Sequence, residues 1–316
     1  MTRMHWRAQM VAAAVCSVVL ALSGCGTQSA ADGSSNATAA VSASASATPQ
    51  GPTIAIGVSS DLPGLGYRHE GGYVGFDIDV AAYVANALGY GDKQIVFTPV
   101  APSERAAALE RGDVDMVVAA FGMDERNERE VTFAGPYLTV HPSVLTRGDS
   151  RAASTDGTGD AGGAVDADDG GDAGDGVTCV VRGTIMQERL GSGDALRSYD
   201  TYGQCMTALM VGSVDGIAAD DAILPGLSRN HRGTYRIESI EAAFAGSDAG
   251  VDAGSADAIG YGVAVRRGRV ELASKIAGDL RAMIEDGTWR SYVDANLTPL
   301  GYALSQPPAA DAVAVH

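Results

Sequence analysis

Cationic side chains are scarce in this chain. Its 316 residues include 22 Lys and Arg against 39 Asp and Glu, and the formal net charge at pH 7 is −17. A nucleic-acid-binding surface needs a basic face, so this balance argues against a nucleic-acid partner. Catalytic signatures are missing too. The patterns H-E-x-x-H, C-x-x-C and G-x-S-x-G do not occur, which leaves metalloprotease, dithiol redox and serine hydrolase activities without support.

The N-terminus has the pattern of an export signal. Two arginines precede a short apolar run over residues 11–22, which is too short to span a bilayer comfortably. Residues 22–25, Leu-Ser-Gly-Cys, resemble a bacterial lipobox. We therefore expect a lipoprotein signal peptide over residues 1–24, and a lipid on Cys25 that anchors the protein to the extracytoplasmic face of the cell membrane. A plain secretory signal with a chance cysteine is the alternative.

Cysteines are few, and histidines are scattered. Of the four cysteines, Cys16 lies in the apolar run and Cys25 in the lipobox, which leaves Cys179 and Cys205. Their spacing does not fit a zinc site, so we expect neither a metal nor a cofactor. Two cysteines in an exported domain suggest one disulfide. It would close a loop of roughly 25 residues and stabilise the fold by about 3 kcal/mol.

Composition divides the remainder of the chain. Residues 25–52 consist mostly of Ser, Ala and Thr, which cannot bury a core, and we expect a flexible tether there. About 250 residues follow, enough for two lobes. Two Asp- and Gly-rich stretches, near residues 149–176 and 245–258, interrupt them. We expect both stretches to be solvated, disordered insertions.

A unit of helix, glycine and strand occurs twice. The pattern predicts a helix over residues 103–112, with Ser103 as its N-cap, and an apolar strand over 114–119. Residues 203–212 and 214–219 repeat the unit. Each copy is half of a βαβ crossover, so the sequence predicts two α/β lobes.

The ends of the two predicted strands mark a candidate binding region. In open parallel sheets, ligands bind beyond the carboxyl ends of the strands. That rule points to residues 120–124 in the first lobe and 219–221 in the second. If the lobes face each other, the two segments meet in one cleft.

The C-terminal region predicts a long amphipathic helix. Leu272, Ile276, Leu280 and Ile284 recur at helical spacing before a glycine, so we expect them to face the core. Residues 303–316 have no such pattern, and we expect a frayed tail.

The most specific pattern of the chain lies at residues 75–88. Val80, Val84 and Leu88 recur at helical spacing behind Asp77 and Asp79, where acidic side chains suit the positive end of the helix dipole. The pattern resembles the signature of the solute-binding protein family 3, the extracytoplasmic receptors for polar amino acids in ABC uptake systems. Segments 133–138 and 261–265 and the two cysteines extend the resemblance, which is closest to actinobacterial glutamate-binding lipoproteins.

The resemblance implies a fold and a function. The expected fold is α/β, bilobal and periplasmic-binding-protein-like, of type II, with two lobes joined by a two-segment hinge. Lobe 1 would comprise residues 53–140 and 263–303, lobe 2 residues 141–262, and the tail residues 304–316. The implied function is a monomeric substrate-binding lipoprotein, not an enzyme. It would capture a glutamate-like amino acid or a derivative by lobe closure and deliver it to an ABC permease.

The same resemblance implies the partners of the ligand's charged groups. Asp220 matches the carboxylate that holds the ammonium group of the ligand in the family. Asn127 stands where the family has the arginine that holds the ligand carboxylate. Its neighbour Arg126 could serve instead if the alignment slips locally.

Three further positions depart from the family's carboxylate subsite. Gly122 and Asp124 stand where hydroxyl side chains are usual. Thr184 keeps one of two expected threonines, and Ile185 replaces the other. The loss of one hydrogen bond to a charged group costs about 1.5–3 kcal/mol. We therefore expect an amino-acid pocket with a partly drifted carboxylate subsite.

Other residues are candidates for contact with the ligand's side chain. Arg68 and Arg105 could supply positive charge, and Tyr67 or Phe121 could pack against its body. Phe121 is the better aromatic candidate because it follows a buried strand.

Two alternatives belong to other functional classes. The first is a binding-fold lipoprotein without a transporter, acting as a sensor or a surface interaction module. The second is an enzyme on the same scaffold, which would need a general acid among Asp124, Asp220 and Asp221.

Overall fold

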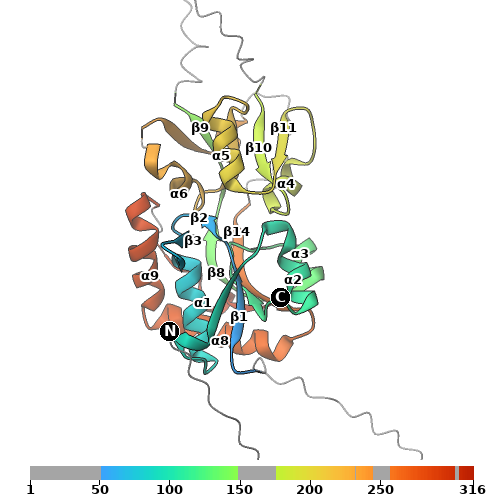
Figure 1. Cartoon of the computed structure of the whole chain (residues 1–316), viewed down its shortest axis with the longest axis vertical. Helices are drawn as coiled ribbons and strands as arrows, with labels where there is room; N and C mark the ends of the chain where they lie inside the picture. The colour runs from blue at the N-terminus through green and yellow to red at the C-terminus, as the bar shows by residue number, and fades with distance from the viewer. Residues whose placement is uncertain (1–50, 149–175, 232, 245–256, 303–305) are drawn as a thin grey trace, which may run out of the picture. The chain divides into compact units, whose positions relative to one another are not determined.

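The computed structural model describes residues 51–148, 176–231, 233–244, 257–302 and 306–316 (Figure 1). The predicted signal peptide, Cys25, almost all of the tether and nearly all of both acidic stretches lie outside these residues. Within the described part, no helix has the length and apolar character needed to cross a membrane.

The first lobe is built on a mixed sheet with the strand order β15-β8-β14-β6-β1-β5, and β7 pairs with β14. Its strands are β1 (Ile54–Val58), β5 (Ile95–Pro99), β6 (Met116–Val117), β7 (Gly122–Met123), β8 (Val131–Val140), β14 (Ile259–Arg266) and β15 (Ala314–Val315). Strands β5 and β6 run parallel to β1, whereas β14 is antiparallel to β6 and β8. A small antiparallel sheet comprises β2 (Asp61–Leu62), β3 (Gly66–His69) and β4 (Gly72–Val74).

The helices of this lobe are α1 (Phe76–Ala87), α2 (Arg105–Arg111), α3 (Glu125–Glu130), α8 (Val270–Glu285) and α9 (Thr288–Asn296). The predicted helix at the family signature is confirmed as α1, which begins after Gly75. The expected apolar stripe is confirmed on α8, where Leu272, Ile276 and Leu280 are buried and Ile284 is partly buried. Short 3-10 turns are η1 (Asp92–Gln94), η2 (Pro102–Glu104), η5 (Thr298–Leu300) and η6 (Ala310–Ala312).

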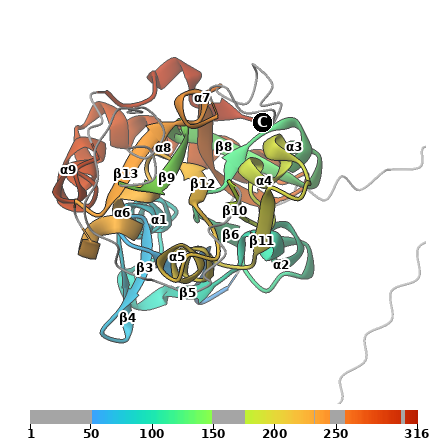
Figure 2. The same cartoon turned by 90° about the horizontal axis from the view of Figure 1, so that it is seen from above.

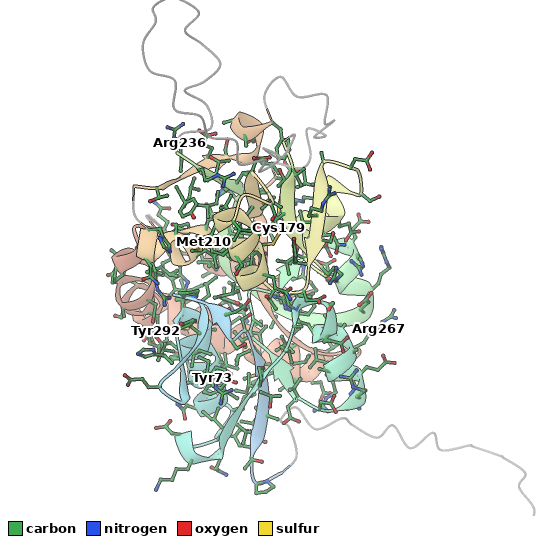
Figure 3. The ribbon with its side chains drawn as sticks, turned by 45° about the horizontal axis from the view of Figure 1, so that its top comes forward. Tyr73, Cys179, Met210, Arg236, Arg267 and Tyr292 are labelled. Atoms are coloured by element: carbon green, nitrogen blue, oxygen red, sulfur yellow. A yellow bond between two sulfur atoms is a disulfide. The ribbon has the colours of Figure 1, made fainter. Side chains whose placement is uncertain are left out.

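The second lobe has a five-stranded sheet in the order β11-β10-β12-β9-β13, which Figure 2 shows from above. Its strands are β9 (Pro142–Arg147), β10 (Thr178–Val181), β11 (Leu196–Tyr199), β12 (Gly216–Asp220) and β13 (Tyr235–Ser239). Its helices are α4 (Ile185–Leu190), α5 (Tyr202–Met210), α6 (Leu224–Ser228) and α7 (Ile240–Ala243), with the 3-10 turn η3 (Arg229–His231). The labelled Cys179 lies on β10 within this lobe (Figure 3).

Two antiparallel strands join the lobes. Strand β8 leads from the first sheet into β9 of the second, and β14 returns to pair with β8 along most of its length. The chain therefore makes two α/β lobes joined by two segments, as predicted. The predicted strands over 114–119 and 214–219 are observed as β6 and β12, and the second predicted helix as α5.

Two expectations were wrong. Ser103 does not cap a helix, because it lies inside the 3-10 turn η2, where Pro102 fixes the first turn, and α2 starts only at Arg105. The tail is not frayed over residues 306–316. Strand β15 pairs with the edge of β8, Phe133 and His316 exchange two backbone hydrogen bonds, and Val313 is buried. An unpaired strand edge favours pairing with a further strand. The local sequence pattern does not show which segment supplies that strand.

Candidate ligand-binding site

The turn after β6 is held by a buried carboxylate of the signature helix. The backbone N–H of Ala120 donates to Oδ2 of Asp77 at 2.8 Å, and the hydroxyl of Tyr137 donates to its Oδ1 at 2.9 Å. Ala120 has a φ of 49°, an uncommon conformation for a residue with a Cβ. Asp77 is fully buried, and burial raises its pKa to about 6. It was predicted only as an acidic residue at the helix start, and its role in fixing this turn was missed.

A buried arginine lies beside the next residue of the turn. The guanidinium of Arg105 is 5.2 Å from the centre of the Phe121 ring, which packs edge-on against Phe133 at 4.9 Å. Arg105 is only 3% exposed. Its Nε is buried and has no hydrogen-bond partner among the described residues. Burial lowers the pKa of this guanidinium, so the site holds a positive charge without a full set of acceptors.

A buried carboxylate of the second lobe has a free acceptor atom. Asp220 is the last residue of β12 and is 8% exposed. The hydroxyl of Tyr261, on the hinge strand β14, donates to its Oδ2. Its Oδ1 is buried and has no partner among the described residues. Burial raises the pKa of Asp220 to about 6. The position at the end of a strand is the one that the sequence predicts.

Buried tyrosines connect the two carboxylates across the hinge. The Tyr137 ring, bound to Asp77, lies 6.4 Å from the Tyr261 ring, bound to Asp220. Tyr202, at the start of α5, is also buried, and its backbone N–H donates to Oδ2 of Asp61 at 3.2 Å. These tyrosines were not among the predicted site residues. The Thr201–Gln204 capping box was the available signal, because it fixes the start of α5.

The segment from Gly122 to Asn127 uses its polar groups internally. The Asn127 amide Nδ2 donates to the Gly122 carbonyl at 2.9 Å. The Asp124 carboxylate caps α3 by accepting the backbone N–H of Asn127 at 2.7 Å. Arg126 is about half exposed and pairs with Glu188 at 3.4 Å and Glu130 at 3.9 Å. These side chains are therefore engaged on α3 and at its surface.

An isoleucine from the second lobe fills the space beside Gly122. A Cβ at position 122 would lie 2.4 Å from Cδ1 of Ile185 and 3.0 Å from Cγ2 of Ile259. Thr184 caps α4, with its hydroxyl accepting the Gln187 N–H at 3.3 Å and donating to the Val181 carbonyl at 2.7 Å. The two unusual residues at positions 122 and 185 are therefore in contact.

The remaining candidates lie elsewhere. Arg68 is exposed on β3. The Tyr67 ring carries the guanidinium of Arg229 at 4.7 Å from its centre. The structure thus brings Arg105 together with Phe121 and Gly122 together with Ile185. It leaves Arg68 in solvent and Arg126 among glutamates.

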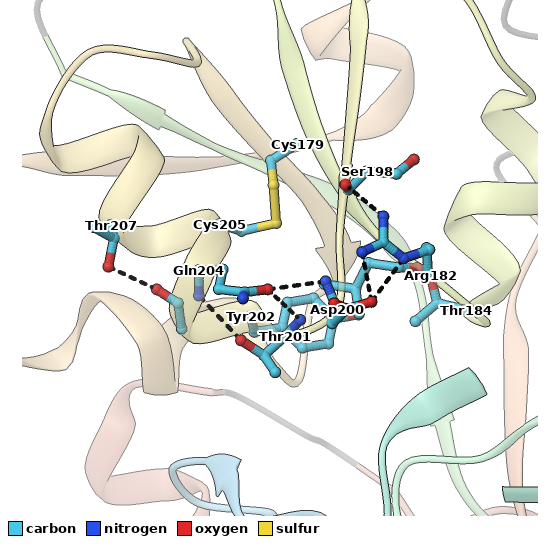
Figure 4. The surroundings of a disulfide bond; sticks show 12 residues. Cys179, Arg182, Thr184, Ser198, Asp200, Thr201, Tyr202, Gln204, Cys205 and Thr207 are labelled. Atoms are coloured by element: carbon cyan, nitrogen blue, oxygen red, sulfur yellow. Dashed lines mark hydrogen bonds and ion pairs between the residues drawn. A yellow bond between two sulfur atoms is a disulfide. The ribbon is translucent and has the colours of Figure 1, made fainter. Parts of the chain in front are cut away.

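A disulfide braces the second-lobe side of the site. The predicted bond between Cys179 and Cys205 is confirmed (Figure 4). It ties β10, which leads to Thr184, to α5, which begins with Tyr202. Gln204 adds to this support, since its side-chain oxygen accepts the backbone N–H groups of residues 200 and 201 at 3.0 and 3.2 Å.

Backbone segments of the two lobes approach closely. A Cβ at Gly183 would lie 2.4 Å from Cα of Ser103, and a Cβ at Gly226 would lie 2.0 Å from the carbonyl oxygen of Pro63. These glycines allow contacts between the lobes that any other residue would prevent. The two lobes are therefore in direct backbone contact at these points, and Asp220 and Arg105 are both buried.

A hollow of about 390 Å³ lies outside this region, against α2, α3 and the end of β14. It is lined by charged residues of both signs, namely Glu110, Arg129, Glu130, Arg266 and Arg267, with Ser103, Ala106, Ala107 and Leu109. Its lining includes neither Asp220 nor Arg105. The buried, unpartnered atoms of Asp220 and Arg105, and not this hollow, define the candidate site; a third such atom, Oδ2 of Asp279, belongs to α8.

Comparisons with known proteins agree with the fold and the predicted family. The family model of bacterial extracellular solute-binding proteins, family 3, matches residues 54–298. The glutamate-binding protein GluB of Corynebacterium efficiens is 28% identical over 252 residues, which cover 77% of this chain and 78% of that protein. The glutamine-binding protein GlnH of Bacillus subtilis is 28% identical over 244 residues, which cover 75% and 78%.

Solved structures show the same fold. The cysteine-binding protein from Campylobacter jejuni superposes with a TM-score of 0.64 at 21% identity, covering 82% of this chain and 94% of that chain. The solute receptor for L-cysteine of Neisseria gonorrhoeae gives a TM-score of 0.62 at 22% identity, covering 79% and 91%. The predicted bilobal type II fold of periplasmic binding proteins is thereby confirmed.

Proposed function

Because the chain belongs to the bacterial extracellular solute-binding proteins of family 3, we propose that it is the substrate receptor of an ABC importer. It captures a small polar amino acid, glutamate-like or a derivative, by closure of its lobes. One observation carries this proposal: Asp220 is buried at the end of β12 and keeps a carboxylate oxygen without a partner in the described structure. A buried acceptor of this kind is costly unless a donor fills it, and the ammonium group of a ligand supplies one.

The other contacts of the ligand follow from the same region. Arg105 is the cationic partner of the ligand's anionic group, and Phe121, on which the guanidinium lies, supports the ligand's body. The carboxylate subsite expected around Gly122, Thr184 and Asn127 has drifted, in keeping with their local hydrogen bonds and with the Ile185 contact.

The receptor is anchored by a lipid on Cys25, acts as a monomer and delivers its ligand to a permease in the membrane. The family consists of extracellular solute-binding proteins. The chain is accordingly a receptor and not an enzyme, and the proposal of an enzyme on this scaffold is set aside.

Identification of the carried ligand tests the proposal. The protein is purified from its native cells in buffers that contain no amines, and it is then denatured. The small molecules that it releases are analysed by mass spectrometry. We expect one polar amine in an amount close to that of the protein, and none from Asp220→Ala. The control Asp200→Ala removes an exposed carboxylate that pairs with Arg182 and should release as much ligand as the native protein. Equal release from Asp220→Ala would contradict the proposal.

The non-transport role remains a second candidate because one observation favours it. Protein groups join the lobes directly through the Arg126–Glu188 pair, the bond from Tyr202 to Asp61 and the Ile185–Gly122 contact. Uptake of the identified ligand by cells with and without the gene separates the two roles. Unchanged uptake in the deletion strain would favour a sensor or an interaction module.

A further inference from the structure

The interlobe site combines a buried carboxylate with a free acceptor oxygen, a separate buried guanidinium with a free N–H donor, and an apolar wall. We propose that its ligand is an ω-amino acid, a zwitterion whose ammonium-bearing carbon carries no carboxylate. Asp220 holds the ammonium group and Arg105 holds the distant anionic group. This inference rests on the proposed function and narrows its ligand class.

The hydrogen-bond donors of Asn127 and Arg126 on α3 are already engaged. A carboxylate next to the ammonium group would need donors close to Asp220. The Asn127 side-chain amide already donates to the Gly122 carbonyl, and the nearby Asp124 carboxylate would repel the carboxylate of a ligand. Arg126 pairs with two glutamates at the surface. The side chains of this segment therefore offer no free positive charge to a carboxylate.

The wall of the site beside Gly122 is apolar. The δ-methyl group of Ile185 occupies the place of a side chain at position 122, and Ile259 closes the same spot from the hinge strand. Both isoleucines are buried. An ionised carboxylate placed against methyl groups loses its hydration without compensation. The wall thus rejects a carboxylate and accepts methylene groups.

Arg105 is a buried cation with an unused N–H donor. A guanidinium has five N–H donors and is always charged. The Nε of Arg105 is buried and unpartnered, and neither Asp61 nor Asp77 forms an ion pair with it among the described residues. A charge buried in this way requires an anion or several acceptors. The anionic group of a ligand meets this need, and a carboxylate can accept two of the donors.

The two charges of the site belong to different lobes. Asp220 comes from β12 of the second lobe and Arg105 from α2 of the first, and no ion pair joins them within the described structure. Phe121 lies beneath the guanidinium. A ligand with methylene groups between its charges fits this arrangement.

Calorimetric titration with a series of zwitterions tests the inference. The purified protein is stripped by unfolding and refolding, then titrated with β-alanine, γ-aminobutyrate, 5-aminovalerate, L-glutamate and L-glutamine. We expect one of the three ω-amino acids to bind at least tenfold more tightly than either α-amino acid. Tighter binding of L-glutamate or L-glutamine would overturn the inference and leave the proposed function standing. No binding of any compound would overturn both.

A variant of Arg105 tests whether this residue holds the anionic group of the ligand. Arg105→Met should weaken binding of the preferred ω-amino acid about tenfold to a hundredfold and should leave binding of n-butylamine, which has no anion, unchanged. Arg111→Met is the matched control, because Arg111 lies on the same helix, is exposed and pairs with Asp113. If Arg105→Met weakens both probes equally, Arg105 does not hold the anion.

A rebuilt wall gives an independent readout. Gly122→Ser alone places its Cβ against Ile185 and should weaken all binding. Adding Ile185→Thr removes the Cδ1 contact at 2.4 Å, leaves the milder contact with Ile259 at 3.0 Å, and supplies a second hydroxyl donor. The double variant should therefore gain L-glutamate affinity relative to the ω-amino acid, by about tenfold or more. If the double variant keeps the original ligand preference, the Gly122–Ile185 contact does not set the ligand class.

Discussion

Asp77 and Asp220 are the two carboxylates whose burial most affects this protein. The pKa of each rises from an ordinary value of 3.8 to about 6. A folded-state pKa above the unfolded value means that ionisation opposes folding. The stabilising contribution of each neutral carboxyl is complete below pH 3.8 and is lost as the pH rises through about 6. The two groups differ in role, because Asp77 holds a backbone turn and Asp220 offers a free oxygen.

Asp77→Asn should remove part of the pH dependence of stability. The rise in pKa corresponds to about 3 kcal/mol of differential stability between the protonated and ionised forms. We expect the variant's loss of stability relative to the native protein to be larger at pH 4 than at pH 7, by about 2 kcal/mol, because the unfolded chain is already partly ionised at pH 4. Urea unfolding at both pH values measures it. A deficit that does not change with pH would show that Asp77 is not buried as an acid.

Ligand affinity should fall in acid because of Asp220. An ammonium group binds the carboxylate and not the neutral acid. The dissociation constant should therefore be nearly constant above pH 7 and rise about tenfold per pH unit below pH ~6. Titrations between pH 4.5 and 8 measure this. Asp77→Asn should keep this pH dependence of the dissociation constant, and Asp220→Asn should lack it. The reverse pattern would show that Asp77, and not Asp220, is the group that titrates.

At the scale of elements, the start of α1 depends on a glycine that no other residue can replace. Gly75 has a φ of 128°, and a Cβ there would lie 2.1 Å from the carbonyl oxygen of Leu65. The same backbone also places the Asp77 carboxylate in the core, where it accepts the backbone N–H of Ala120 in the turn after β6. The family signature thus has a steric and an electrostatic cause in this chain.

Gly75→Ala and Gly89→Ala form a matched pair at the two ends of α1. Both glycines have positive φ, but nothing lies within 4 Å of a Cβ at Gly89. We expect Gly89→Ala to cost about 1–2 kcal/mol, from backbone conformation alone. Gly75→Ala should cost more than about 3 kcal/mol, since the clash adds to it. Thermal or urea unfolding compares them, and equal costs would rule out the Leu65 contact as the cause.

At the scale of the whole molecule, glycine backbones of one lobe lie directly against the other. Gly183 and Gly191 both have φ near 70–77°, but only the first would place a Cβ against Ser103 of the other lobe. Gly183→Ala should therefore hinder closure and weaken ligand binding at least tenfold, because ligand contacts need both lobes. Gly191→Ala, whose Cβ meets nothing within 4 Å, should leave affinity unchanged. Native affinity in Gly183→Ala would show that this contact is not formed on binding.

The sequence was most informative where the pattern is local or chemically constrained. It predicted α1, the stripe of α8, the Cys179–Cys205 bond and the place of Asp220 at a strand end. It did not predict that Ile185 fills the space beside Gly122 or that β15 covers the edge of β8. These contacts join residues far apart in the chain, and no local periodicity records them. The two departures at positions 122 and 185 could be seen in the sequence, but only the fold shows that they compensate each other.

The most direct test of the account is a calorimetric comparison of the stripped native protein with Asp220→Asn. The ligand is the preferred zwitterion of the series, titrated at pH 7.5, with Asp200→Asn as the control for a lost surface carboxylate. The account predicts saturable binding by the native protein and the control, and affinity weakened about tenfold to a hundredfold or more in Asp220→Asn. Native affinity in Asp220→Asn would contradict the account, because the buried free oxygen of Asp220 would then hold no ligand.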